Sequence, residues 1–270
     1  MTLTLTLYTP PAGPVEAPTL RPDGLAGLSH AAIAALPVLY GNQPATVGDF
    51  FRVSGEPGPE VTLEGDLSGF MGLGQQMASG TLRVAGPVGR RAGAGMTGGV
   101  LEVAGDADDW AGAEMAGGRL VIRGNAANHL GSAYSGSRQG MQGGEIVVHG
   151  RAGHDAARAM RRGLVAIGGD CGDWAGADLL AGTLVVMGQL GARPGAGMRR
   201  GTIVSLMAAA LLPTFNLACV YRPTFLRLYL RYLREAGLPL TDDHVAGAYA
   251  RYSGDHLELG RGEILIWEGA

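Results

Sequence analysis

The stretch Met96-Thr-Gly-Gly-Val-Leu-Glu-Val103 returns 19 residues later as Met115-Ala-Gly-Gly-Arg-Leu-Val-Ile122, and it keeps returning along the middle of the chain. Each copy consists of a methionine or leucine, called the corner residue here, followed by a glycine and a four-residue segment with the pattern of a strand. The corners are separated by 19, 19, 26, 19, 19 and 19 residues; they are Met77, Met96, Met115, Met141, Met160, Leu179 and Met198. Similarity at a fixed period is typical of stacked repeat proteins.

Within these four-residue segments, successive side chains are expected to point to opposite sides. In one copy Leu101 and Val103 point to one side and Glu102 to the other, which is the period of a strand and not of a helix. A strand this short cannot bury its apolar side alone, so the copies must stack. The sequence therefore predicts an all-β fold, a right-handed parallel β-helix of about seven 19-residue coils, with neighbouring coils about 4.8 Å apart.

The extent of the repeat predicts three regions. Residues 1–60 are expected to form a strand-rich N-terminal cap over the open end, residues 61–206 the β-helix, and residues 207–270 a C-terminal extension. In the cap, strands are expected over residues 2–8, 38–43 and 47–55, with a short helix over residues 30–36.

The C-terminal extension is expected to contain a helix over residues 225–236, stopped by Gly237, and a closing hairpin with strands at 256–259 and 263–267. The spacing of its side chains predicts two faces. Phe225, Leu228, Tyr229 and Tyr232 line the apolar face, whereas Arg227, Arg231 and Arg234 share the other. Packing on the end of the β-helix and docking of a partner both remain open for this helix.

The recurrent methionine is expected to stack on itself and fill a corner of the core. A metal-binding methionine column is the alternative, but thioether ligands usually act together with Cys or His, and glycine and alanine surround these positions. The single 26-residue interval contains seven extra residues near 133–139. These residues are expected to loop out from one coil and leave the stack intact.

Composition limits the classes of function. The chain has 270 residues, of which 46% are hydrophobic and 17% charged, and its net charge of −3 implies no general attraction to nucleic acid. The first eight residues lack the basic start of a signal peptide, and no apolar run is long enough to span a membrane. Cys171 and Cys219 are expected to be small buried thiols. A cytoplasmic location is the expectation.

No catalytic or metal-binding motif is found. The six histidines form no HxH or HExxH pattern, and the glycine-rich strings recur in step with the coils and lack a following GK[ST] motif. His154, Asp155 and Asp173 share one edge of the predicted coils with Asp109 and two tryptophans. The simpler interpretation is that they are exposed residues that recur with the repeat and have no catalytic role. The alternative hypothesis is a stand-alone enzyme that uses His154, Asp155 or Asp173.

Two arginine pairs occupy the same phase of the repeat. Arg161-Arg162 and Arg199-Arg200 lie two coils apart, which corresponds to roughly 10 Å. Arginines at this separation suit carboxylates of a partner or an anionic chain. Solvated arginines are the simpler interpretation of the same pattern.

The coils with Met-x-Gly-Gly corners resemble the domain shared by the C subunit of formylmethanofuran dehydrogenase and the C-terminal part of the glutamate synthase large subunit. The flanking motifs resemble the former; they are Tyr40-Gly-Asn-Gln43, Val47-Gly-Asp-Phe-Phe-Arg-Val-Ser-Gly55 and Tyr252-Ser-Gly-Asp-His-Leu-Glu-Leu-Gly-Arg-Gly-Glu-Ile264. The resemblance covers residues 38–266. Leu211-Leu-Pro-Thr-Phe-Asn216 and the Arg/Tyr/Leu helix are similar to the bacterial branch, the formyltransferase/hydrolase complexes of methylotrophs.

This resemblance implies a non-catalytic scaffold subunit. In such complexes formyl passes from tetrahydromethanopterin to a methanofuran-type carrier and is hydrolysed to formate, by an amidohydrolase-like subunit that holds the metal and a formyltransferase-like subunit. The resemblance therefore assigns no catalytic residue, metal or cofactor to this chain. It suggests Arg161, Arg162, Arg199 and Arg200 as contacts for the anionic tail of the carrier. The alternative complex is a molybdenum or tungsten formylmethanofuran dehydrogenase.

Overall fold

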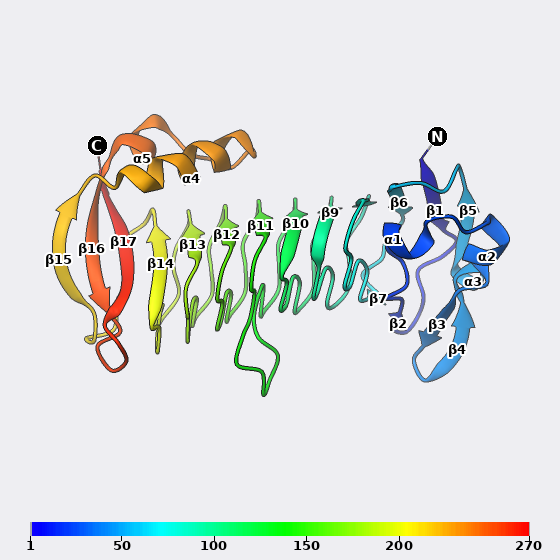
Figure 1. Cartoon of the computed structure of the whole chain (residues 1–270), viewed down its shortest axis with the longest axis horizontal. Helices are drawn as coiled ribbons and strands as arrows, with labels where there is room; N and C mark the ends of the chain where they lie inside the picture. The colour runs from blue at the N-terminus through cyan, green and yellow to red at the C-terminus, as the bar shows by residue number, and fades with distance from the viewer. Residues whose placement is uncertain (1, 270) are drawn as a thin grey trace.

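The computed structural model describes residues 2–269, in which strands of the repeat region stack along the long axis of the molecule (Figure 1). These strands pair in parallel within one 13-stranded sheet. They are β6 (Glu60–Glu64), β8 (Thr81–Val84), β9 (Thr97–Val103), β10 (Gly117–Ile122), β11 (Glu145–Val148), β12 (Leu164–Ile167), β13 (Thr183–Val186) and β14 (Arg200–Ser205). Pairing joins equivalent positions of successive repeats, as in Val165 beside Leu184. The fold is mostly β with a large parallel sheet, consistent with the predicted β-helix.

A second line of parallel bridges links the repeats at a distance from the sheet. It passes through Leu67, Val88, Ala107, Ala126, Ala152, Cys171 and Leu190. Between the two lines lies the apolar core, and the methionine corners belong to it. The predicted role of the methionines as core residues is confirmed, because Met77, Met96, Met115, Met141, Met160 and Met198 have no exposed surface.

One glycine position shows why the corners are so rich in this residue. Gly176 has a φ of +67°, and a Cβ atom built on it would lie 2.7 Å from Cδ1 of Ile203 in the core. Left-handed backbone and close packing together favour glycine. In an equivalent position of the preceding repeat the chain has Ala157, with a φ of +57°. That single repeat accommodates a methyl group at this position, where the others have glycine.

The N-terminal region pairs with the first repeat strand. β1 (Leu3–Leu7) lies parallel to β6 and antiparallel to β5 (Phe51–Ser54). A separate four-stranded sheet has the order β4-β3-β2-β7. Its strands are β2 (Val15–Glu16), β3 (Pro37–Tyr40), β4 (Gln43–Thr46) and β7 (Phe70–Met71), and short helices α1 (Pro22–Leu25) and α2 (His30–Ala34) complete the region.

The continuous strand predicted over residues 47–55 is wrong in its first half. Residues Val47–Phe50 form the helical turn α3 before β5 begins. The carboxylate of Asp49 accepts hydrogen bonds from the backbone N–H and the hydroxyl of Thr46, at 2.7 and 2.8 Å. This capping interaction favours a helical turn over an extended start, and apolar periodicity alone does not reveal it.

At the other end, helix α4 (Thr224–Glu235) lies along the outer face of the sheet over the last repeats (Figure 1). Its buried face is Leu226, Leu230 and Leu233, at spacings of four and three residues. The predicted apolar face is therefore not the packed one: Phe225, Leu228, Tyr229 and Tyr232 remain 37–72% exposed. The helix has two apolar stripes, and the narrower leucine stripe meets the sheet.

Three further strands end the sheet: β15 (Asn216–Tyr221), β16 (Ala248–Gly254) and β17 (Arg261–Gly269). β17 continues the parallel stack beside β14, and the chain reaches it through the antiparallel neighbour β16. The predicted first hairpin strand at 256–259 is wrong, because residues 255–260 form the connection between β16 and β17. The short helix α5 (Asp242–Ala246) precedes β16.

The extra residues of the 26-residue interval loop out as predicted. Residues 134–137 form a turn closed by a 2.9 Å hydrogen bond from the Ser137 N–H to the Tyr134 carbonyl, and the loop projects below the stack in Figure 1. Within residues 2–269, no helix has the length and apolar character required to cross a membrane.

Candidate functional site

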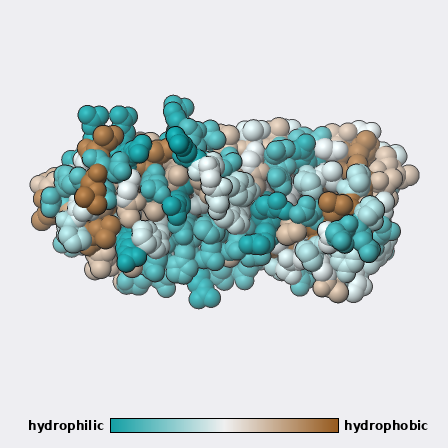
Figure 2. Space-filling view, turned by 90° about the horizontal axis from the view of Figure 1, so that it is seen from below, coloured by the Kyte–Doolittle hydropathy of each residue, from teal (hydrophilic) through white to brown (hydrophobic). Residues whose placement is uncertain are grey.

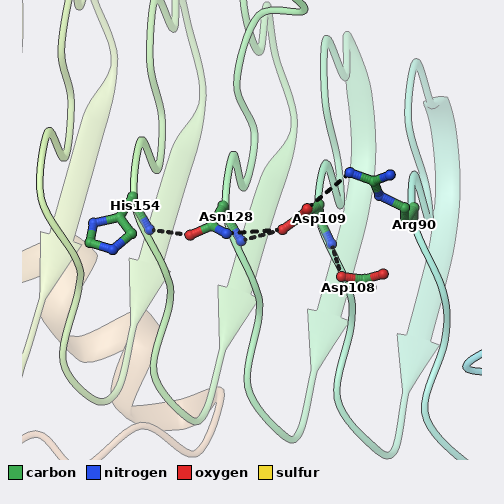
Figure 3. A network of polar contacts seen from close by, with 5 residues as sticks. All are labelled: Arg90, Asp108, Asp109, Asn128 and His154. Carbon is green, nitrogen blue, oxygen red and sulfur yellow. Dashed lines mark hydrogen bonds and ion pairs between the residues drawn. The ribbon is translucent and has the colours of Figure 1, made fainter.

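The edge that contains His154 is a continuous ladder of hydrogen bonds between repeats (Figure 3). Asp109 Oδ1 accepts from the Asn128 backbone N–H at 2.9 Å, and Asn128 Oδ1 accepts from the His154 N–H at 2.9 Å. His154 Nδ1 then accepts from the Asp173 N–H at 2.9 Å. Each side chain therefore holds the backbone of the next repeat.

The hydrogen bonds of this edge show the roles of His154, Asp155 and Asp173, the three candidate catalytic residues. Because Nδ1 of His154 accepts from a backbone N–H, the neutral ring carries its proton on Nε2. Asp155 points to a different partner, Arg158 Nη1 at 3.1 Å, and Asp173 Oδ1 accepts from the Ala192 N–H at 2.7 Å. Among residues 2–269, no hydrogen bond joins His154 to a carboxylate. The edge links repeats and does not assemble an acid–base pair.

A second ladder, missed in the sequence, runs parallel to the first. Asp106 Oδ1 accepts from the Asn125 N–H at 2.6 Å, and Asn125 Oδ1 accepts from the Arg151 N–H at 3.1 Å. Asp170 repeats the contact with the Gln189 N–H at 2.7 Å. The signal was present as Asp or Asn at the repeat spacing, but a short polar residue beside glycine is also typical of ordinary turns.

A third column next to the ladders has left-handed backbone without glycine. Its members have φ between +58° and +67° and are Arg91, Trp110, His129, Asp155, Trp174 and Arg193. Several stack from repeat to repeat: Trp110 and His129 rings lie 4.1 Å apart, and the Arg193 guanidinium lies 4.8 Å from the Trp174 ring centre. Stacking offsets part of the cost of a positive φ at a non-glycine residue, about 1–2 kcal/mol.

The projecting loop and two members of this column, Trp110 and His129, line part of a surface cavity of about 500 Å³. Trp110, His129 and Tyr134 form an aromatic wall, with Trp110 and Tyr134 ring centres 5.0 Å apart. Three arginines also line the cavity, and two of them are neutralised. Arg158 contacts Asp155 and Asp178, both at 3.1 Å, and Arg199 contacts Glu258 at 3.1 Å.

The four arginines singled out in the sequence do not form one site. Strand register places Arg161 in phase with Arg199, and Arg162 in phase with Arg200. Arg199 lines the 500 Å³ cavity, whereas Arg162 lines a different cavity of about 380 Å³ beside Tyr229 of α4. Within residues 2–269, Arg161, Arg162 and Arg200 have no ion-pair partner. All four side chains are exposed.

The sulfur and metal-ligand residues show no assembled site in residues 2–269. No group of three or more His, Cys, Asp or Glu side chains is placed to hold a metal ion there. Cys171 is buried, and this burial raises the pKa of its thiol to about 12. The prediction of a buried Cys219 is wrong, because this thiol is exposed on β15. The number and spacing of the cysteines argue against a disulfide or zinc site but carry no information on burial, and β15 is the last strand of the sheet.

The repeat region of this chain is shared with known proteins. The GXGXG motif family matches residues 100–214. The C subunit of the tungsten-containing formylmethanofuran dehydrogenase 2 of Methanothermobacter marburgensis is 39% identical over 90 residues, 32% of this chain and 33% of that protein. The C subunit of the molybdenum-containing formylmethanofuran dehydrogenase 1 of Methanothermobacter thermautotrophicus is 38% identical over 82 residues, 30% of this chain and 20% of that protein. The matched segment thus spans about a third or less of these relatives.

A solved structure extends the likeness to nearly the whole chain. It is the crystal structure of the formyltransferase/hydrolase complex (FhcABCD) from Methylorubrum extorquens in complex with methylofuran. One of its chains superposes with a TM-score of 0.90 and 34% identity, over 97% of this chain and 98% of that chain. The chain described here belongs to the family of formylmethanofuran dehydrogenase C subunits, whose GXGXG motif it carries.

Proposed function

We propose that this chain is a non-catalytic scaffold subunit of a formyltransferase/hydrolase complex. The observation that carries the proposal is the similarity along almost the entire chain to one chain of the methylofuran-bound complex of Methylorubrum extorquens. Similarity of that length and identity favours the same place in the same kind of assembly. A match to the repeat region alone would favour only the fold.

The chemistry of the edge residues supports a scaffold. Backbone N–H groups of neighbouring repeats donate to His154 Nδ1 and to Asp173 Oδ1, and Arg158 forms an ion pair with Asp155. A general base needs a free acceptor within reach of the substrate proton. In the proposed assembly, an amidohydrolase-like subunit with the metal and a formyltransferase-like subunit perform the reaction. Formyl passes from tetrahydromethanopterin to a methanofuran-type carrier and is released as formate.

The proposal includes the finer architecture. A right-handed β-helix of about seven 19-residue coils forms residues 61–206, residues 1–60 cap one end, and residues 207–270 extend the other. Parallel register from β6 through β14 supports the stack, and β1 beside β6 supports the cap. Such a rod holds partner subunits at a fixed distance because its core is continuous from repeat to repeat.

The proposal also assigns Arg161, Arg162, Arg199 and Arg200 as contacts for an anionic carrier tail. Three of the four lack an ion-pair partner in residues 2–269, which leaves their guanidinium groups available for carboxylates. Replacing all four with Gln should weaken binding of the carrier to the complex. Unchanged binding would remove this assignment and leave the scaffold role intact.

A second candidate is the C subunit of a molybdenum- or tungsten-containing formylmethanofuran dehydrogenase. It is favoured by the names of the curated relatives, which are 37–40% identical over the segment that they share with this chain. The two candidates differ in their neighbours. A dehydrogenase requires redox subunits, whereas the hydrolase complex requires a transferase.

Gentle purification of the tagged chain from its native host tests the proposal. The scaffold role predicts co-purification with an amidohydrolase-like and a transferase-like chain, and loss of their association when this scaffold is deleted. Redox subunits in the assembly would select the dehydrogenase. A chain that elutes alone, carries metal and turns over formyl compounds would overturn the scaffold role and favour the stand-alone enzyme with His154, Asp155 or Asp173.

A further inference from the structure

The two edges of the 13-stranded sheet are finished in different ways. At one edge, β5 is packed against helix α2. At the other edge, β15 pairs with β16 on its inner side, and no strand of residues 2–269 pairs with its outer side. An outer strand presents unpaired N–H and C=O groups, which form a template for another strand.

The side chains of β15 add to this template. Asn216 through Val220 are all exposed, and Leu217 and Val220 keep 58% and 56% of their surfaces in solvent. The strand contains neither a charged residue nor proline, two devices that usually protect a free edge. Figure 2 shows hydrophobic residues at the end of the molecule where β15–β17 lie in Figure 1, whereas the middle of that view is mostly hydrophilic.

We propose that β15 pairs antiparallel with β15 of a second copy of this chain, across a two-fold axis. A second copy fits this edge because the strand is complementary to itself. In a two-fold interface each residue near the axis meets its own neighbours again, so any charge there faces a like charge. β15 avoids such repulsion between like charges because none of its residues is charged.

Full overlap of the two strands sets the register. Leu217 then lies opposite Val220 of the second copy, so that two apolar pairs form, one on each side of the axis. The irregularity at Ala218, where the register with β16 shifts, falls at the centre of both strands. Along the chain, Arg222 is the nearest charge, and its copy lies about 23 Å away, beyond the distance over which exposed charges interact at physiological salt. In the neighbouring strand, Arg251 lies opposite Cys219, and Glu263 pairs with it at 2.7 Å.

The mass of the full-length chain in solution tests this pairing. Sedimentation velocity of the wild-type protein should give a dimer of about 55 kDa, twice the 27.7 kDa of one chain. Leu217→Glu and Val220→Lys should each weaken dimerisation at least about tenfold, since each places a charge opposite an apolar side chain. The double variant Leu217→Glu/Val220→Lys should dimerise again, because the register brings Glu and Lys together twice.

The control is Leu228→Lys, a change of the same kind at a 72% exposed leucine of α4. It should leave the dimer intact, and circular dichroism should show the same β content for all variants. A wild-type chain that stays monomeric up to about 100 μM would overturn the proposal and assign the edge to a different partner. So would a dimer that survives both single variants, or one that only Leu228→Lys dissociates. This inference does not depend on the proposed formyl chemistry.

Discussion

The outer face of the large sheet differs between its two halves, although the inner face is the same throughout. Over the first repeats this face carries charged residues: Arg83 contacts Glu60 at 3.0 Å and Glu102 at 3.2 Å, and all three side chains are partly in solvent. In the column that contains Arg83 and Glu102, the later repeats have Val147, Ala166 and Val185, which are completely buried.

The difference lies in what covers each half. The later residues form a second apolar cluster with the leucines of α4, separate from the core between the two lines of bridges. A strand with both faces buried becomes apolar along its whole length, as in Leu164-Val-Ala-Ile167. The repeated inward residues thus form the core of the stack in both halves. The outward column determines which half helix α4 covers.

The largest expected effect is a charge introduced beneath the helix. Val185→Glu should lower the free energy of unfolding by about 3–5 kcal/mol, since it buries a carboxylate without a partner. Arg83→Val, the reverse exchange in the open half of the same column, should change it by less than about 1 kcal/mol. Urea unfolding followed by circular dichroism measures both. Equal losses would mean that the two halves do not differ in the way described.

A smaller effect is expected from the inner face, and it should be alike in both halves. Gly93→Ala in the open half and Gly176→Ala in the covered half each require a positive φ and bring a Cβ within 3.0 Å of a core side chain. Each should destabilise by about 1–3 kcal/mol. Thermal unfolding compares them. A loss confined to one half would contradict a core shared by all repeats.

The ladder at His154 should contribute about 1 kcal/mol, the usual net value of a hydrogen bond. His154→Leu removes the acceptor for the Asp173 N–H and should lower stability by that amount. His154→Asn places in the ladder the residue type that already serves at position 128, and it should retain most of the stability. If both variants are equally destabilised in urea, the imidazole has a role other than that of acceptor.

The smallest expected effect is a dependence on pH in the covered half. Burial, reinforced by the guanidinium of Arg123, lowers the pKa of His149, and burial lowers the pKa of His244. The unfolded chain therefore binds these protons more readily, so stability is complete above the ordinary histidine pKa of about 6.5 and falls as the pH drops through and below it.

The urea midpoint at about pH 7.5 and at about pH 5.5 measures this dependence. The double variant His149→Gln/His244→Asn should lose part of the drop seen in the wild-type chain, because neither substituted side chain titrates. Both histidines lie at or near the C-terminal extension, His244 in α5 and His149 with Cε1 close to Gly237. An identical drop in the variant would assign the pH dependence to other groups.

Prediction from the sequence succeeded where identical local contacts repeat. The parallel register, the buried methionine corners and the looped-out residues near 133–139 were all visible as a period and its single interruption. Prediction failed where one segment must choose between surfaces. Helix α4 has two apolar stripes, and the stripe with Leu226, Leu230 and Leu233 packs although the other contains the larger aromatic residues. The capped turn α3 and the exposed Cys219 are similar failures.

By itself the sequence determined a stacked rod with an apolar interior, because a 19-residue period imposes the same strand, corner and core residue on each repeat, and only translation along one axis satisfies all of them. The tertiary structure alone decided where the C-terminal chain returns over the rod, which helix face it buries, and which side chains become acceptors for the next repeat. These choices depend on contacts between residues far apart in the sequence, whose energies no local pattern contains. The outward column from Arg83 to Val185 depends on both the sequence and the tertiary structure. Its positions follow the sequence period, but the burial of its later residues comes from α4, a helix outside the repeat.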